Sequence, residues 1–117
     1  MDNKILTKRE IKEELRNLPG WIYLDNKIMK EYKFNDFMDA FGFVCWLAMY
    51  FEMMDHHPDI NITYDRVLFQ LQRFDVGGKV TDRDVVVAKE IEKRYSARDR
   101  KADWERVSKT GSYFMHQ

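Results

Sequence analysis

The sequence has little cysteine and no net charge. Cys45 is the single cysteine in 117 residues, so no disulfide can form within the chain. That is typical of a reducing compartment, and we expect a cytoplasmic protein. Because Cys45 lies in an apolar run, we expect it to be a small core residue. The 20 lysines and arginines are balanced by 20 aspartates and glutamates. A neutral chain is not expected to bind nucleic acid directly, and it lacks the self-repulsion that keeps proteins monomeric.

The sequence also lacks a long uninterrupted hydrophobic run. The N-terminal residues, MDNKILTKREIKEELRNL, are charged and amphipathic, without an apolar stretch of the signal-peptide type. The most apolar run, FMDAFGFVCWLAMYFEMM (residues 37–54), contains Asp39 and is shorter than the ~20 apolar residues of a membrane span. We therefore predict a core helix in this run and no membrane association.

Only two prolines are present, and both mark predicted helix ends. Thr7 and Glu10 have the spacing of a capping box, which predicts a first helix that ends at Pro19. Asn35 is the predicted N-cap of a second helix, from about residue 36 to 54, which ends before Pro58. Thr81 is the predicted N-cap of a third helix.

Two hairpins separate these helices. WIYL and KIMKEYKF alternate around Asp25-Asn26, and INITY and VLFQLQRF alternate around Asp65-Arg66. The order α-β-β-α-β-β-α predicts an α+β fold with a four-stranded antiparallel sheet, formed by two hairpins and covered by three helices. We expect one domain over residues 1–96. Residues 97–117 would form a C-terminal extension that is helical at its start.

The second helix is apolar around more than one stripe. We expect it to be central to the domain or shared with a neighbouring subunit. Its main apolar residues are Phe37, Ala40, Phe41, Val44, Leu47, Ala48 and Phe51. Phe43, Trp46 and Tyr50 are expected to lie beside them.

Two adjacent histidines, His56 and His57, follow this helix in the motif DHHP. At a corner between a helix and a strand, both side chains can lean into one cleft. Three interpretations are open at this point: a cap of the helix C-terminus, a metal site assisted by Asp55 or Asp59, and acid–base catalysis. Since no further His or Cys lies at a recognisable ligand spacing, the metal site is the least favoured, and we predict none.

The stretch EMMDHHPDINITY, followed by FDVGGKVTDRD, resembles the signature of the pterin-4a-carbinolamine dehydratases. The resemblance covers about residues 5 to 95. Each part of the motif is weak alone, but the parts in this order are specific for the family. The positions that carry it are Glu52, His56, His57, Pro58, Tyr64, Phe74 and Asp84.

This resemblance implies a hydro-lyase that needs no cofactor and acts on a pterin in tetrahydrobiopterin biosynthesis. It would convert 4a-hydroxytetrahydropterin to quinonoid dihydropterin and water. The two histidines would be the catalytic acid–base residues, with His57 favoured for proton transfer. Glu52 would orient His56 or contact the pterin. Pro58, Tyr64 and Phe74 would line the substrate site, and Asp84 is not expected to be catalytic. Members of the family form homodimers and homotetramers.

One position departs from the family pattern. Phe74 stands where members carry His or Trp, so one proton carrier is missing, although the phenyl ring could stack on a pterin. This predicts slow turnover. The alternative is a non-catalytic member that binds a pterin, or that stabilises the dimer of a protein partner. A different pterin substrate is a third interpretation.

Overall fold

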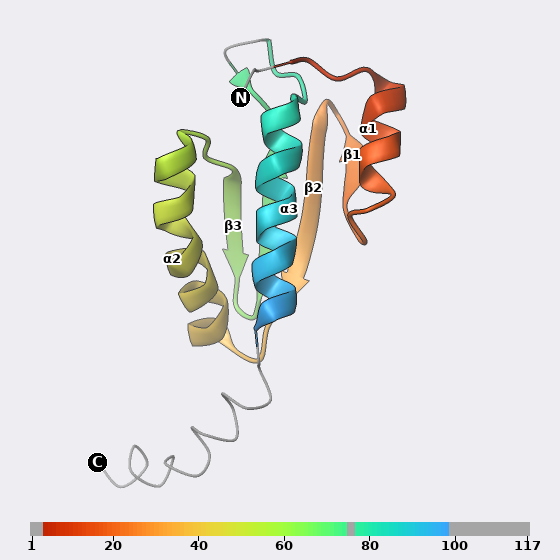
Figure 1. Cartoon of the computed structure of the whole chain (residues 1–117). Coiled ribbons are helices and arrows are strands. Elements are labelled where there is room, and N and C mark those ends of the chain that lie inside the picture. The colour runs from red at the N-terminus through yellow and green to blue at the C-terminus, as the bar shows by residue number, and fades with distance from the viewer. Residues whose placement is uncertain (1–3, 75–76, 99–117) are drawn as a thin grey trace, which may run out of the picture.

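The structure, a computed structural model, describes residues 4–74 and 77–98. Its helices are α1 (Lys8–Leu15), α2 (Phe37–Met54) and α3 (Asp82–Ala97), and its strands are β1 (Ile22–Leu24), β2 (Lys27–Lys33), β3 (Asp59–Thr63) and β4 (Arg66–Leu71). The strands pair in the order β1-β2-β4-β3, and every pair is antiparallel. The predicted α+β fold and its element order are therefore confirmed (Figure 1).

The first hairpin turns at the predicted dipeptide, and the second turns one residue earlier than predicted. Asp25 and Asn26 have φ of 53° and 62°, as a tight hairpin turn requires. In the second hairpin the turn is Tyr64–Asp65, and Tyr64 has φ of 51°. Tyr64 is therefore not the strand residue that alternation indicated. Phe74 also lies outside the strand, because β4 ends at Leu71.

The helix caps are confirmed at two of three starts. The Thr7 hydroxyl accepts from Glu10 N at 3.1 Å, and Glu10 Oε1 accepts from Thr7 N at 3.0 Å. Thr81 is the N-cap of α3, as predicted. For α2 the predicted cap is wrong by one residue. Asp36, not Asn35, adopts the extended backbone of an N-cap, and its carboxylate accepts from Asp39 N at 2.8 Å.

The third helix stops at the start of the predicted extension. Ala97 is its last residue, and Arg98 has φ of −66° and ψ of 125°, which is extended backbone. Ala97, the first residue of the predicted extension, is therefore helical, and Arg98 is not. Residues 99–117 lie outside the described residues, so the rest of that prediction and the domain boundary at 96 stay predictions.

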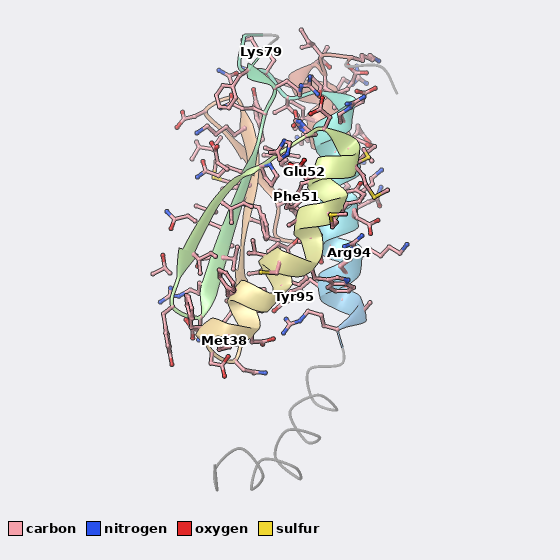
Figure 2. All side chains as sticks on the ribbon, turned by 90° about the vertical axis from the view of Figure 1, so that its left-hand side faces the viewer. Met38, Phe51, Glu52, Lys79, Arg94 and Tyr95 are labelled. Atoms are coloured by element: carbon pink, nitrogen blue, oxygen red, sulfur yellow. The ribbon has the colours of Figure 1, made fainter. Side chains whose placement is uncertain are left out.

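The core lies between the sheet and the helices. Figures 1 and 2 show α2 and α3 side by side on one face of the sheet, with α1 beside β1. Tyr32 of β2 is at the centre: its ring lies 5.9 Å from that of Phe69, 6.2 Å from that of Phe43 and 4.6 Å from that of Tyr95. Burial of such rings is the main stabilising contribution here.

One stripe of α2 enters the core, and most of the helix surface remains outside it. The buried residues are Ala40, Phe43, Leu47 and Phe51. Large apolar residues on the rest of the helix are exposed: Phe37, Met38, Phe41, Trp46, Met49 and Met53. Cys45 is also exposed, so its predicted core position is wrong. The helical repeat of 100° places it opposite the buried stripe.

By length and composition alone, α2 meets the minimum for a membrane span, with 18 residues and a mean hydropathy of 1.3. Its N-terminus is capped by Asp36, and its buried stripe packs on the sheet. This packing supports the predicted core helix. It also leaves the other apolar residues of α2 exposed.

Candidate active site at the corner between α2 and β3

A left-handed residue ends α2 and turns the chain toward β3. Asp55 has φ of 49°, a conformation that aspartate tolerates better than most residues. The N–H groups of Asp55 and His56 then donate to the carbonyls of Glu52 and Phe51, each at 3.1 Å. These bonds satisfy the last carbonyls of the helix and fix the backbone that carries the histidines.

His56 is buried and pairs with a carboxylate from a distant part of the chain. Its side chain is 4% exposed, and its Nε2 forms a short hydrogen bond to Oδ1 of Asp84, which is 0% exposed. Since a buried carboxylate without a partner is costly, the imidazole and the carboxylate need one another. This pair connects the end of α2 to the beginning of α3.

Two further interactions hold this junction. The second oxygen of Asp84 accepts from Thr81 N at 2.8 Å, so the carboxylate also caps α3, where the helix dipole favours a negative charge. Arg83 Nη1 donates to the Met54 carbonyl at 3.1 Å, across the same junction. Asp84 is thus a member of the site that the sequence reasoning undervalued. The sequence placed Asp84 in the family motif without a catalytic role, and nothing in the sequence paired it with His56.

His57 also pairs with a carboxylate, but in solvent. Its Nε2 lies 2.7 Å from Glu52 Oε1, and the two side chains are 55% and 70% exposed. Glu52 was expected to orient His56 or to contact the pterin. In the structure it pairs with His57 and not with His56, and contact with a pterin stays a prediction. Figure 2 shows Glu52 on the solvent-facing side of the molecule, near the end of α2. A carboxylate only accepts, so Nε2 of His57 carries a hydrogen and Nδ1 is the nitrogen that can gain or lose a proton.

The remaining predicted site residues lie in three different settings. Pro58 is buried. Phe74 is 71% exposed and lies at the same end of the sheet as His57, because Asp59 of β3 pairs with Gln70 of β4. Tyr64, 67% exposed, lies in the turn at the opposite end of β3. The structure therefore brings Phe74 to the histidine end of the sheet and does not bring Tyr64 there.

The geometry favours proton transfer over the other two interpretations of the histidine pair. No group of three or more His, Cys, Asp or Glu that could hold a metal is present among residues 4–74 and 77–98. The helix-capping role falls to backbone N–H groups and not to the imidazoles. What remains is an exposed imidazole oriented by a carboxylate, the arrangement expected of a general acid or base.

Comparisons with known proteins point to one family. The family model described as "Pterin 4 alpha carbinolamine dehydratase" matches residues 4–94. A Sulfurisphaera tokodaii protein is 43% identical over 89 residues, which are 76% of this chain and 95% of that protein. A Prochlorococcus marinus protein is 38% identical over 92 residues, which are 79% of this chain and 95% of that protein. Both carry the name "Putative pterin-4-alpha-carbinolamine dehydratase".

A solved structure is similar as well. The crystal structure of a transcriptional coactivator/pterin dehydratase from Brucella melitensis has a TM-score of 0.71 and 38% identity. The similarity covers 75% of this chain and 95% of that one.

Proposed function

The chain belongs to the pterin-4a-carbinolamine dehydratase family, and from this premise we propose that it converts 4a-hydroxytetrahydropterin to quinonoid dihydropterin and water. The observation that carries the proposal is the exposed His57–Glu52 pair beside the buried His56–Asp84 pair. His57 is the proposed acid–base group, and His56 is the proposed positioning group beside it. Neither a metal nor an organic cofactor is needed for a reaction that only moves protons and releases water.

The proton balance can be completed by His57 alone. Protonated His57 delivers the Nδ1 proton to the 4a-hydroxyl, the C4a–O bond breaks, and water leaves. The neutral imidazole then takes the proton from N5 of the pterin cation, which yields the quinonoid product and restores protonated His57. The Glu52 carboxylate at Nε2 stabilises the imidazolium and keeps the ring in one orientation.

His56 has a different proposed role because it is nearly inaccessible to solvent. Its ring is fixed by Asp84, so it offers a rigid edge against which the pterin can be held. Phe74, exposed at the same end of the sheet, would stack on the flat heterocycle. Since a phenyl ring carries no proton, the site works with one carrier fewer than a site with three histidines, and we propose slow turnover.

A second candidate function is favoured by two observations. Phe74 stands where members of the family carry His or Trp, so a proton carrier is missing. The similar Brucella protein is named a transcriptional coactivator as well as a dehydratase. In this alternative the chain binds a pterin without turnover, or stabilises the dimer of a protein partner.

We also propose a homo-oligomer, a dimer or a tetramer, in the cytoplasm. The rings of Phe37 and Phe41 stack at 5.9 Å, and both residues are exposed. By the 100° helical repeat they lie on the flank of α2 that faces away from α3. A second copy covering this flank would bury that apolar surface.

The test is the dehydration of chemically generated 4a-hydroxytetrahydropterin, followed by absorbance in a stopped-flow instrument. Wild-type protein should accelerate the reaction, and His57→Ala should abolish the acceleration. His116→Ala, which removes the third histidine of the chain, is the matched control and should leave the rate unchanged. If wild-type protein binds the pterin but gives no acceleration, the non-catalytic function replaces the dehydratase.

A further inference from the structure

We propose that Arg83, in the first turn of α3, is a positioning residue for His57 and acts through the backbone carbonyl of Met54. The inference rests on the proposed function, because His57 is the residue to which proton transfer is assigned there. Arg83 Nη1 donates to the Met54 carbonyl at 3.1 Å, three residues before His57 along the chain. The bond therefore holds the backbone from which the histidine pair projects.

The end of α2 needs a hydrogen-bond donor from outside the helix. The last carbonyls of an α-helix have no partner within the helix itself. Two of those in α2 accept from N–H groups just past the helix end. The Met54 carbonyl instead accepts from Arg83. Because α2 has no basic residue in its last turn, this guanidinium also supplies the positive charge that a helix C-terminus favours.

The corner after α2 has a backbone conformation that requires support. Asp55 has φ of 49° and ψ of 46°, a left-handed conformation that costs free energy in a residue with a side chain. α3 holds the chain on both sides of Asp55. Before it, Arg83 binds the Met54 carbonyl, and after it, Asp84 binds the His56 imidazole. Since Arg83 and Asp84 are adjacent in the first turn of one helix, the two bonds fix the corner as a unit.

The exposed pair depends on this corner for its geometry. Glu52 lies in the last turn of α2 and His57 lies beyond the corner, so the corner sets the 2.7 Å between Oε1 and Nε2. With side chains 70% and 55% exposed, the pair attracts too weakly to fix the backbone itself. A group that transfers a proton has to be held within about 0.5 Å of its productive position. That restraint comes from the partly buried side of the corner, where Arg83 lies.

A second arginine of α3 makes the same kind of bond away from the corner. Arg94 Nη1 donates to the Trp46 carbonyl at 2.9 Å, and its Nε donates to Glu90 at 2.8 Å. Trp46 is eight residues before Met54, which is ~12 Å along a helix. Figure 2 shows Glu52 near the upper end of α2 and Arg94 lower down. Both arginines tie α3 to α2, so the difference between them isolates the effect at the corner.

Replacing each arginine by methionine in the full-length chain tests the proposal, because methionine keeps an apolar stem and removes the donor. In Arg83→Met we expect kcat for 4a-hydroxytetrahydropterin to fall about tenfold at unchanged KM, the pattern of an interaction lost from the transition state. Amide hydrogen exchange of Asp55 and His56, followed by NMR, should become about tenfold faster as the corner opens locally. Arg94→Met should leave kcat and both exchange rates within about twofold of wild type.

Equal losses of kcat in Arg83→Met and Arg94→Met would overturn the proposal, because both arginines would then only pack the helices together. Wild-type kcat in Arg83→Met would overturn it as well. Arg83→Lys keeps a cation at the helix end and should have a kcat between those of Arg83→Met and wild type, so it replaces the methionine variant should that fail to fold. If wild-type protein shows no turnover, the proposed function fails and the exchange rates alone decide. Exchange at the corner that is unchanged in Arg83→Met would then overturn the inference too.

Discussion

The molecule contains the same pair of groups twice, once buried and once in solvent. His56–Asp84 and His57–Glu52 each join an imidazole Nε2 to a carboxylate oxygen, and the histidines are adjacent in sequence. His56 is 4% exposed and His57 is 55% exposed. A buried pair cannot lose one member without leaving the other unsatisfied, whereas an exposed pair is solvated in either protonation state. This difference in exposure supports a stabilising role for the first pair and the proposed proton exchange for the second.

The largest effect should come from removing the buried carboxylate. Asp84→Ala deprives His56 of its partner and Thr81 N of its acceptor, so we expect a loss of about 3 kcal/mol in the free energy of unfolding, measured by urea denaturation. Glu52→Ala is the matched control from the exposed pair and should cost less than about 1 kcal/mol. Equal costs for the two variants would erase the distinction between the pairs.

Changing the exposed carboxylate, Glu52, should have a smaller effect, and this effect should be on turnover and not on stability. Glu52→Gln keeps the size of the side chain but cannot stabilise a protonated His57 as a carboxylate does. We expect turnover to fall about tenfold, which is about 1.4 kcal/mol of activation free energy, with the urea midpoint unchanged. If Glu52→Gln turned over at the wild-type rate, the carboxylate of Glu52 would not assist His57 in proton transfer.

The smallest effect should follow from adding a proton carrier beside the exposed pair. Phe74 is 71% exposed, so Phe74→His should leave the unfolding free energy within about 0.5 kcal/mol of wild type. We expect the steady-state turnover to rise severalfold, because a second titratable group can share the transfer from N5. A Phe74→Leu variant tests the ring itself and should weaken pterin binding in a fluorescence titration. If turnover fell for Phe74→His while pterin binding was unchanged, the phenyl ring itself would be needed to line the site. A histidine at this position would then not improve proton transfer.

The parts of the fold that depend on neighbouring residues were predictable from the sequence. The Thr7–Glu10 capping box and the Asp25-Asn26 turn each involve residues within three positions of one another, and both are found as predicted. Both hairpins were predicted as well, although the second turns at Tyr64–Asp65, one residue earlier than the sequence indicated. The order of elements then follows, because each short segment carries its own signal.

The parts that depend on distant contacts were not predictable. Asp84 lies 28 positions from His56, so only the packing of α3 against the end of α2 brings the carboxylate to the imidazole. The partner of each histidine was therefore not predictable, and Glu52, one of whose two expected roles was to orient His56, pairs with His57. The uniform apolar character of α2 likewise conceals which stripe is buried. For that reason exposed Cys45 was taken for a core residue, and buried Phe43 was placed beside the core stripe.

Chemical rescue of His57→Ala tests whether His57 is the residue that transfers the proton. Turnover of 4a-hydroxytetrahydropterin by this variant would be measured with and without added imidazole. Because His57 is exposed, the account predicts that free imidazole enters the vacated position and restores part of the lost rate, while His56→Ala gains nothing. The account would be contradicted if His57→Ala turned over at the wild-type rate, or if imidazole rescued His56→Ala and not His57→Ala.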